Sequence, residues 1–322
     1  MVGWRGRNVL VTGANGFVGS WLAEELVSRG AKVTALIRDI IPNSNLNLSG
    51  TADRVSIVRG SLTDYKTVER AFNEYEIEIC FHLAAQAIVG VANRSPISTF
   101  ESNIMGTWDL LEACRTARHF DRVIVASSDK AYGDQEKLPY TEDSPLLGTY
   151  PYDASKVCAE AITRSYHKTY GLKAAVARCA NIYGGGDLNM SRLVPDMMIS
   201  LLNGKPLVIR SDGKMERDYI YVKDAADAYV LLAEQIENAN GQAFNFGAGK
   251  PVTVLDLVKM IIEASGRKDA EMKVLGEAKY EIKKQYLDSS KARKLGWQPK
   301  HGLSDGLKET YAWYQEHQEL FS

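Results

Sequence analysis

The sequence has few cysteines and histidines, and neither residue type forms a cluster. There is no CxxC pair, and three of the four cysteines lie inside apolar runs; the four are Cys80, Cys114, Cys158 and Cys179. This pattern favours reduced, buried thiols over a disulfide framework or a zinc site. The five histidines are scattered as well, so we predict no metal centre.

The chain also lacks an excess of charge of either sign. It has 39 basic and 40 acidic residues, which leaves a formal net charge of -1. No long-range electrostatic field would therefore attract nucleic acid or an anionic membrane. We predict neither as a partner, and any anionic ligand must be held by local groups.

Long apolar runs, repeats and linkers are missing too. No stretch is long enough to span a bilayer, and the first residues, MVGWRGRNVLVTGANG, enter a strand without the segments of a secretion signal. We therefore expect a cytoplasmic protein. With 322 residues and 45% apolar composition, the chain can bury a large core, as one elaborate domain or two tightly packed lobes with a cleft between them.

Short β-rich runs alternate with segments of helical periodicity such as 17–29 and 105–118. The expected strands are 8–12, 32–37, 55–59, 79–83, 122–127 and 174–178. The alternation predicts an α/β fold in which a doubly wound parallel sheet is covered on both faces. We expect residues 1–178 and about 219–247 to form this dinucleotide-binding domain. Residues 179–218 and 248–322, approximately, would form a smaller α/β substrate-binding lobe, with helices at 194–203 and 254–265.

Gly13, Gly16 and Gly19 form a GxxGxxG motif between the first strand and the first helix. The first glycine permits a tight turn, the second lets backbone amides approach a pyrophosphate, and the third allows close packing of helix on strand. The motif alone also fits a plain strand–helix turn, but its context favours a dinucleotide site. After the second strand, Arg38 would suit the 2′-phosphate of NADP and Asp39 the free hydroxyl of NAD, so the choice of cofactor stays open.

Three YxxxK spacings occur, and only one of them lies in helical sequence. Tyr152 and Lys156 are one helical turn apart on the same face. The other two pairs, Tyr219/Lys223 and Tyr280/Lys284, lie in strand-like sequence, where residues four apart are separated by roughly 13 Å. A phenol that acts as a base near neutral pH needs its pKa lowered by roughly 3 units from about 10. Lys156 and a positive nicotinamide ring are the expected causes.

Ser128, Asp129 and Lys130 follow the expected strand 122–127, at the edge of the sheet where ligands bind. Ser128 would hydrogen-bond the substrate hydroxyl that Tyr152 deprotonates. Ser128 and Asp129 also fit a helix cap or a turn, but their place ahead of Tyr152 favours a catalytic role.

These motifs together resemble the extended short-chain dehydrogenase/reductase family of NAD-dependent epimerases and dehydratases. The resemblance covers nearly the whole chain; its motifs are TGANGFVG (12–19), HLAAQ (82–86), NIMGT (103–107), SSDKAYG (127–133) and YDASK (152–156). Within the family, SDK (128–130), RCAN (178–181), GGGD (184–187) and RLVPD (192–196) most resemble the CDP-glucose and GDP-mannose 4,6-dehydratases. The segment RDYIYVKD (217–224) and Ser61, where the branch usually has Asp, depart from that pattern and leave the nucleobase open.

The resemblance implies a Rossmann-type fold and a set of ligand contacts. Catalysis would fall to Ser128, Asp129, Lys130, Tyr152 and Lys156. Contacts with NAD or NADP would come from Gly13, Asn15, Gly16, Phe17, Val18, Gly19, Arg38, Ser61, Leu62, Leu83, Ala84, Ala85, Gln86, Asn103, Tyr152 and Lys156. A CDP-, GDP-, UDP- or dTDP-hexose would contact Gln86, Ser128, Asn181, Arg192, Leu193, Arg217 and Tyr286. Arg217 could clasp a diphosphate, or simply pair with Glu216 or Asp218.

The expected reaction is a 4,6-dehydration, with Asp129 protonating the leaving C6 hydroxyl and Lys130 taking or helping to take the C5 proton. A 4-epimerase is the nearest rival; such enzymes usually carry small uncharged residues after the position of Ser128, so the Asp129–Lys130 pair counts against it. A silent dinucleotide-binding sensor would not need Tyr152 or Lys156. The resemblance also suggests a homodimer through helices near 105–118 and 154–170, although their apolar faces could equally pack within the monomer.

Overall fold

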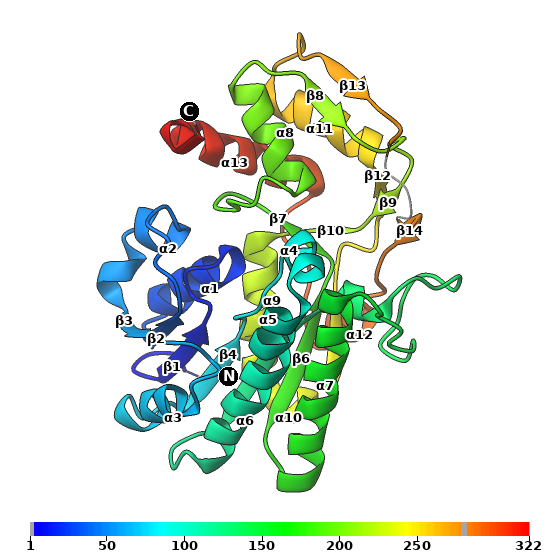
Figure 1. The fold of residues 1–322 in the computed structure, drawn as a ribbon. Helices are drawn as coiled ribbons and strands as arrows, with labels where there is room; N and C mark the ends of the chain where they lie inside the picture. Colours follow the sequence, from blue (N-terminus) through cyan, green and yellow to red (C-terminus); the bar gives the residue numbers. More distant parts are fainter. Residues whose placement is uncertain (1–2, 278–281, 322) are drawn as a thin grey trace.

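The computed structural model describes residues 3–277 and 282–321, and its larger part is built on a seven-stranded parallel sheet (Figure 1). The strand order is β11-β6-β5-β4-β1-β2-β3. The strands are β1 (Asn8–Thr12), β2 (Lys32–Ile37), β3 (Ser56–Arg59), β4 (Ile79–His82), β5 (Arg122–Ser128), β6 (Ala174–Cys179) and β11 (Ala243–Phe246). The six strands expected from the sequence are present to within one residue at each end. The doubly wound α/β fold is confirmed.

Helices cover both faces of the sheet, and each face has its own hydrophobic core. Successive side chains of β1 point to opposite faces, so that Val9 and Val11 enter one core and Leu10 the other. This double burial explains why the strands read as continuous apolar runs. The helices of the Val9 face include α1 (Phe17–Ser28), α9 (Val222–Glu234) and α10 (Ile236–Ala239), and those of the Leu10 face include α3 (Tyr65–Glu74), α6 (Gly106–Thr116) and α7 (Pro151–Tyr170).

The expected helix 105–118 has a different beginning in the structure. It continues from α4 (Val89–Arg94) and α5 (Pro96–Phe100) through a π-helical turn at Glu101–Met105 before α6 begins at Gly106. A Cβ atom on Gly106 would lie 2.8 Å from the Cβ of Leu62, so this helix packs closely against the loop after β3. Wide π turns recur at functional sites, and this one carries Asn103.

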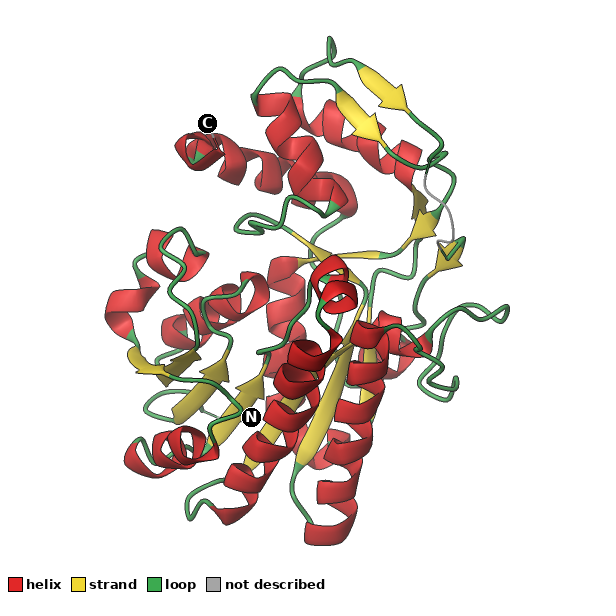
Figure 2. Cartoon of the chain, in the orientation of Figure 1, coloured by secondary structure: helices red, strands yellow, loops and turns green. Residues whose placement is uncertain are grey.

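The smaller lobe lies beyond the carboxyl ends of the strands, at the top of Figure 2, and has a third hydrophobic core. Leu257, Val258 and Ile261 of α11 pack in it with residues of α8 and α13. The remaining elements of the described chain, in either part, are α2 (Asn45–Leu48), β7 (Asn181–Tyr183), α8 (Leu193–Leu202), β8 (Leu207–Ile209), β9 (Glu216–Arg217), β10 (Tyr219–Tyr221), β12 (Val252–Thr253), α11 (Val254–Ser265), β13 (Met272–Val274), β14 (Lys284–Gln285), α12 (Ser290–Lys294) and α13 (Leu303–Glu316), with single 3₁₀ turns at Thr51–Arg54, Asp129–Tyr132 and Gln318–Phe321. The assignment of residues to two domains stays a prediction.

The four cysteines are free thiols, and Cys158 is exposed on α7 whereas the other three are buried. Among residues 3–277 and 282–321, none of the helices has the length and apolar character needed to cross a membrane.

Candidate active site

A cavity of about 640 Å³ lies between the carboxyl ends of the sheet strands and the smaller lobe. Open α/β sheets bind their ligands at this edge. The sequence-predicted residues that line it are Phe17, Val18, Leu83, Ala85, Ser128, Asp129, Lys130, Tyr152, Lys156, Asn181, Arg192, Leu193 and Arg217. The structure therefore brings together residues from both halves of the chain.

The glycine loop has the shape that a dinucleotide diphosphate requires. Gly13 has a φ of +69°, and a Cβ there would lie 2.9 Å from the backbone of Ala84. A Cβ on Gly19 would clash with the carbonyl oxygen of Gly13. Gly16 caps α1 without a side-chain hydrogen bond, so the first amides of the helix remain available to an anion. These residues fit a dinucleotide cofactor.

The residues expected around the adenosine lie outside the lining of the cavity. Arg38 and Asp39 are exposed and form an ion pair at 2.7 Å, while the Asn15 side chain donates to the carbonyl oxygen of Asp39 at 2.6 Å. The Ser61 hydroxyl lies 2.8 Å from the Thr63 hydroxyl and so supports its own turn. This geometry places Asp39 beside the glycine loop but does not choose between NAD and NADP.

Tyr152 lies in the first turn of α7, after Pro151 at a position where proline favours helix initiation. Lys156 lies one turn further on; its Nζ donates to the carbonyl oxygen of Ala126 at 2.8 Å and is 5.8 Å from the centroid of the Tyr152 ring. By contrast, Tyr219 belongs to β10 and Lys223 to α9, where the lysine pairs with Glu309 at 2.9 Å. Tyr280 lies outside the described residues. Among the described residues, helical YxxxK geometry therefore belongs to Tyr152 and Lys156.

Burial changes the pKa values of both Tyr152 and Lys156. Burial raises the pKa of Tyr152 to about 12, against the opposing effects of the Ser128 hydrogen bond and the positive charge of Arg192. Burial also lowers the pKa of Lys156 to about 8, although the Glu160 carboxylate opposes this shift. The lowering of the Tyr152 pKa that we expected from Lys156 is therefore not produced by the protein groups, because desolvation of the phenol outweighs them.

The Asp129 side chain forms a buried part of the cavity lining. It is only 3% exposed, and its Oδ1 accepts a hydrogen bond from the Ser128 hydroxyl at 3.1 Å. Its Oδ2 accepts no hydrogen bond from the described residues and lies 3.5 Å from the ammonium of Lys130. The Ser128 hydroxyl also accepts a hydrogen bond from the Lys130 amide N–H at 3.2 Å. Ser128 therefore also caps the 3₁₀ turn Asp129–Tyr132, as its sequence position allowed. A buried carboxylate oxygen without a hydrogen bond is poised for one from a ligand.

Of the residues expected to bind a sugar nucleotide, some line the cavity and others do not. Arg192 pairs with the buried Asp187 at 2.9 Å, and Arg217 donates to the carbonyl oxygen of Glu216 at 2.9 Å. Asn181 donates to the carbonyl oxygen of Asp218 at 3.1 Å. All three line the cavity. Tyr286 does not, and its ring lies 5.3 Å from the ammonium of Lys284.

Sequence reasoning missed a stretch of the cavity wall formed by Val208, Ile209, Arg210 and Ser211. These residues belong to β8 and the turn after it. A three-residue strand gives no readable periodicity, and the one signal was the basic Arg210 after an apolar run. Ile88 and Val89, at the start of α4, were missed as well, because a helix of six residues is too short to show a clear period.

Asn103 and Gln86 are hydrogen-bonded to each other, and Asn103 is also hydrogen-bonded to α7, the helix that carries Tyr152 and Lys156. The Asn103 amide donates to the Ser155 hydroxyl at 2.9 Å, and its Oδ1 accepts from the Gln86 amide N–H at 2.7 Å. The Gln86 side chain turns back to accept from the Ile88 N–H at 3.1 Å. Both residues lie outside the lining of the cavity, and their contact with a ligand stays a prediction.

His82, at the end of β4, should make the free energy of unfolding depend on pH under acidic conditions. Its ring nitrogens lie 3.0 Å from the hydroxyls of Thr12 and Thr107, and burial, with the charge of Lys156, lowers its pKa from 6.5 to about 3. The unfolded chain therefore binds the extra proton between pH 6.5 and 3, so this group removes stability as the pH falls through that window. We expect His82→Asn to be less stable than the parent at pH 7.5, with the gap narrowing by about 1.4 kcal/mol per pH unit below 6.5. Urea unfolding at pH 7.5 and 5 measures it; an unchanged gap would contradict the assignment.

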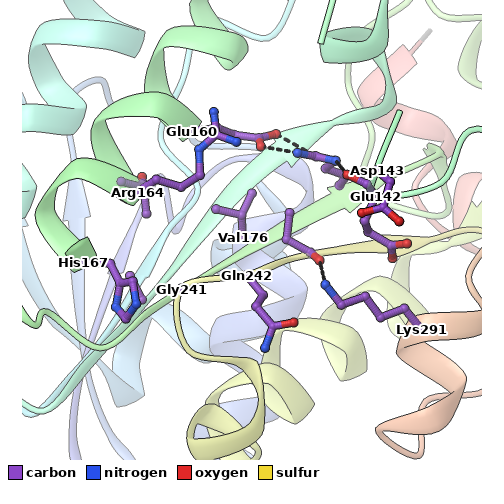
Figure 3. Close-up of a pocket in the computed structure, with 13 residues that line it drawn as sticks. Glu142, Asp143, Glu160, Arg164, His167, Val176, Gly241, Gln242 and Lys291 are labelled. Atoms are coloured by element: carbon purple, nitrogen blue, oxygen red, sulfur yellow. Dashed lines mark hydrogen bonds and ion pairs between the residues drawn. The ribbon is translucent and has the colours of Figure 1, made fainter. Parts of the chain in front are cut away.

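A second cavity, of about 160 Å³, lies at the edge of the sheet beside β6 and β11 (Figure 3). Its polar groups are largely paired with one another: Arg178 donates to both oxygens of Glu160, at 2.9 and 2.6 Å, and Lys291 donates to the carbonyl oxygen of Ala243 at 2.9 Å. Of the predicted catalytic and ligand-binding residues, none lines this cavity. The larger cavity is therefore the candidate active site.

Comparisons with known proteins agree with this geometry. A family model described as "NAD dependent epimerase/dehydratase family" matches residues 9–247. The chain is 32% identical to a CDP-glucose 4,6-dehydratase of Salmonella typhimurium, over 97% of this chain and 91% of that protein. It spans about half the length of the trifunctional UDP-glucose 4,6-dehydratases of Arabidopsis thaliana that it also matches.

Solved structures of two activities resemble the fold. DesIV, a dTDP-glucose 4,6-dehydratase of Streptomyces venezuelae with NAD and TYD bound, has a TM-score of 0.87 and 28% identity over 97% of this chain and 98% of that one. A UDP-glucose 4-epimerase of Thermotoga maritima with UDP-glucose has a TM-score of 0.88 and 32% identity over 97% and 99%. The glycine loop, the Tyr152–Lys156 helix and the match over residues 9–247 lead to one conclusion: the chain belongs to the NAD-dependent epimerase/dehydratase family.

Proposed function

We propose that the protein is a nucleotide-sugar 4,6-dehydratase, which converts an NDP-hexose into an NDP-4-keto-6-deoxyhexose and water. The observation that carries the proposal is the Asp129–Lys130 pair beside Tyr152, with Asp129 buried and its Oδ2 free of hydrogen bonds from the described residues. Oxidation at C4 would use Tyr152, Ser128 and Lys156, with the nicotinamide as the hydride acceptor. Loss of water across C5 and C6 needs a further acid and a further base, and this pair supplies both.

The glycine loop and the first turn of α1 would hold the diphosphate of NAD or NADP, with the nicotinamide directed toward Tyr152. When bound, the nicotinamide would accept a hydride from C4 of the sugar and return it to C6. Its positive charge would add to that of Lys156 in favouring the tyrosinate. The NAD bound in the DesIV structure and the family description support NAD, while Arg38 leaves NADP open.

Each acid–base step is assigned to a residue of the cavity wall. Tyr152 removes the proton of the 4-hydroxyl while Ser128 holds the oxygen. The resulting 4-ketone acidifies C5–H, and Lys130 takes that proton as Asp129 protonates the departing C6 hydroxyl, which leaves as water. C6 then gains the returning hydride and C5 regains a proton, so atoms and electrons balance.

Arg192 and Arg217 would bind the diphosphate of the substrate, because both line the cavity and a guanidinium matches phosphate oxygens. Asn181 and Leu193 lie beside them on the wall. We also propose a homodimer through α6 and α7, which pack side by side (Figure 1) and expose Trp108 and Tyr170.

A 4-epimerase is the second candidate, favoured by the similarity to the Thermotoga maritima structure. In that reaction the 4-ketone would rotate in the site and regain the hydride at C4. The Tyr152 centre serves both reactions, but an epimerase has no step that uses a buried carboxyl group and an amine beside C5 and C6. The Asp129–Lys130 pair therefore favours dehydration.

The proposal is tested by product mass. Purified protein, with its bound cofactor identified, is incubated with CDP-glucose, GDP-mannose, UDP-glucose, UDP-N-acetylglucosamine and dTDP-glucose. We expect one of them to lose one water and thereby to identify the nucleotide. A changed sugar of unchanged mass would instead establish the epimerase.

A further inference from the structure

Gln285, on β14, has no role in the reaction as described so far, yet its side chain reaches both members of the Asp129–Lys130 pair. Its Oε1 accepts a hydrogen bond from the Lys130 ammonium, and its Nε2 donates to the main-chain carbonyl oxygen of Asp129 at 3.0 Å. The residue is fully buried. Both ends of the amide are thus committed to the two residues proposed to carry out elimination.

The backbone fixes the place of this side chain. Gln285 pairs in parallel register with Arg217 of β9, and its carbonyl oxygen accepts from the Asp218 N–H at 3.2 Å. β14 thereby connects β9, which carries Arg217, to the Asp129–Lys130 pair. A side chain held this firmly can act as a fixed acceptor for a long, flexible lysine.

The neutrality of the amide matters for the chemistry. Lys130 already faces two carboxylates, Asp129 at 3.5 Å and Asp153 on α7. Arg217, the register partner of Gln285, is the positive group of the adjacent strand. To take the C5 proton, Lys130 must be a neutral amine, and an amide oxygen can accept a hydrogen bond from an amine or an ammonium alike. A third carboxylate would hold it as the ammonium.

We propose that Gln285 is a positioning residue for water elimination, which fixes the Lys130 amine beside the buried Asp129 without adding negative charge. This inference rests on the proposed dehydratase function. It predicts different defects for two variants. Gln285→Met keeps the size of the side chain and removes the acceptor, whereas Gln285→Glu keeps the acceptor and adds the charge.

The test follows the two half-reactions separately in the holoenzyme, with the nucleotide sugar that loses water. For Gln285→Met we expect C4 oxidation and KM within about twofold of the parent, and elimination slowed about 10–100-fold. For Gln285→Glu we expect the acidic limb of the kcat profile to move to higher pH, because a base held protonated needs a higher pH to act. Gln242→Met, at an exposed glutamine, is the matched control.

A readout independent of turnover is the acylation of Lys130 by an amine-reactive reagent, followed by peptide mass spectrometry across pH. We expect Gln285→Glu to need a higher pH for the same acylation rate. Unchanged elimination, pH profile and acylation in both variants would overturn the inference and leave the dehydratase standing. An equal loss of both half-reactions with a lowered Tm would reduce Gln285 to a structural residue. A parent protein that dehydrates no nucleotide sugar would refute the proposed function itself, and the inference with it.

Discussion

Replacing Tyr152 with phenylalanine is expected to lower kcat by about 10²–10⁴-fold, the usual contribution of a positioned acid or base. The ring lies in the first turn of α7, where the aromatic packing survives the substitution and the hydroxyl alone is lost. The proton of the 4-hydroxyl then has no acceptor, so C4 oxidation fails and every later step with it. Steady-state kinetics and the yield of 4-keto product measure the effect.

Tyr150→Phe is the matched control for this prediction. Tyr150 caps the same helix but is 55% exposed. We expect it to retain the parent rate and the parent Tm. A Tyr152→Phe protein that keeps more than a tenth of the parent kcat would show that another group removes the proton.

Asp129→Asn is expected to separate oxidation from elimination. Asparagine matches the shape of the buried aspartate but cannot protonate a leaving hydroxyl, so elimination should slow by about 10²–10⁴-fold. C4 oxidation, which depends on Tyr152 and Lys156, should continue. A sugar nucleotide two hydrogens lighter than the substrate, still holding its C6 oxygen, should then form in up to one equivalent per bound cofactor, because the hydride stays on the cofactor, and be detected by mass spectrometry.

The control for this variant is Asp134→Asn, an exposed aspartate on the loop that follows. It should dehydrate at the parent rate. If Asp129→Asn also dehydrates at that rate, Asp129 is not the acid, and the argument against an epimerase weakens with it.

The sheet could be predicted from the sequence because its strands are buried on both faces. Double burial makes β1 and β2 near-continuous apolar runs, and their bounds were correct to the residue. The seventh strand, β11, is only four residues long and pairs with β6 from a distant part of the chain. Its pairing depends on tertiary contacts that no local pattern records.

The clustering of the candidate catalytic residues could also be predicted, because each residue type was considered together with its position in a helix or strand. Tyr152 and Lys156 needed a helix, and Ser128 needed the end of a strand; both conditions are met. The expected lowering of the Tyr152 pKa included the charge of the nicotinamide ring and stays a prediction; among the protein groups, burial outweighs the nearby charges, and the sequence shows the charges but not the burial. Gln285 could not be anticipated either, since it reaches Lys130 from 155 residues away in sequence.

The most direct test of the central claim is to follow the hydrogen at C4. The nucleotide sugar that the protein accepts is prepared with deuterium at C4, and the product is analysed by mass spectrometry and NMR. The dehydratase account predicts loss of one water, with the deuterium retained and moved to C6. A product of unchanged mass with the deuterium still at C4 and that centre inverted would contradict the account and make the protein an epimerase.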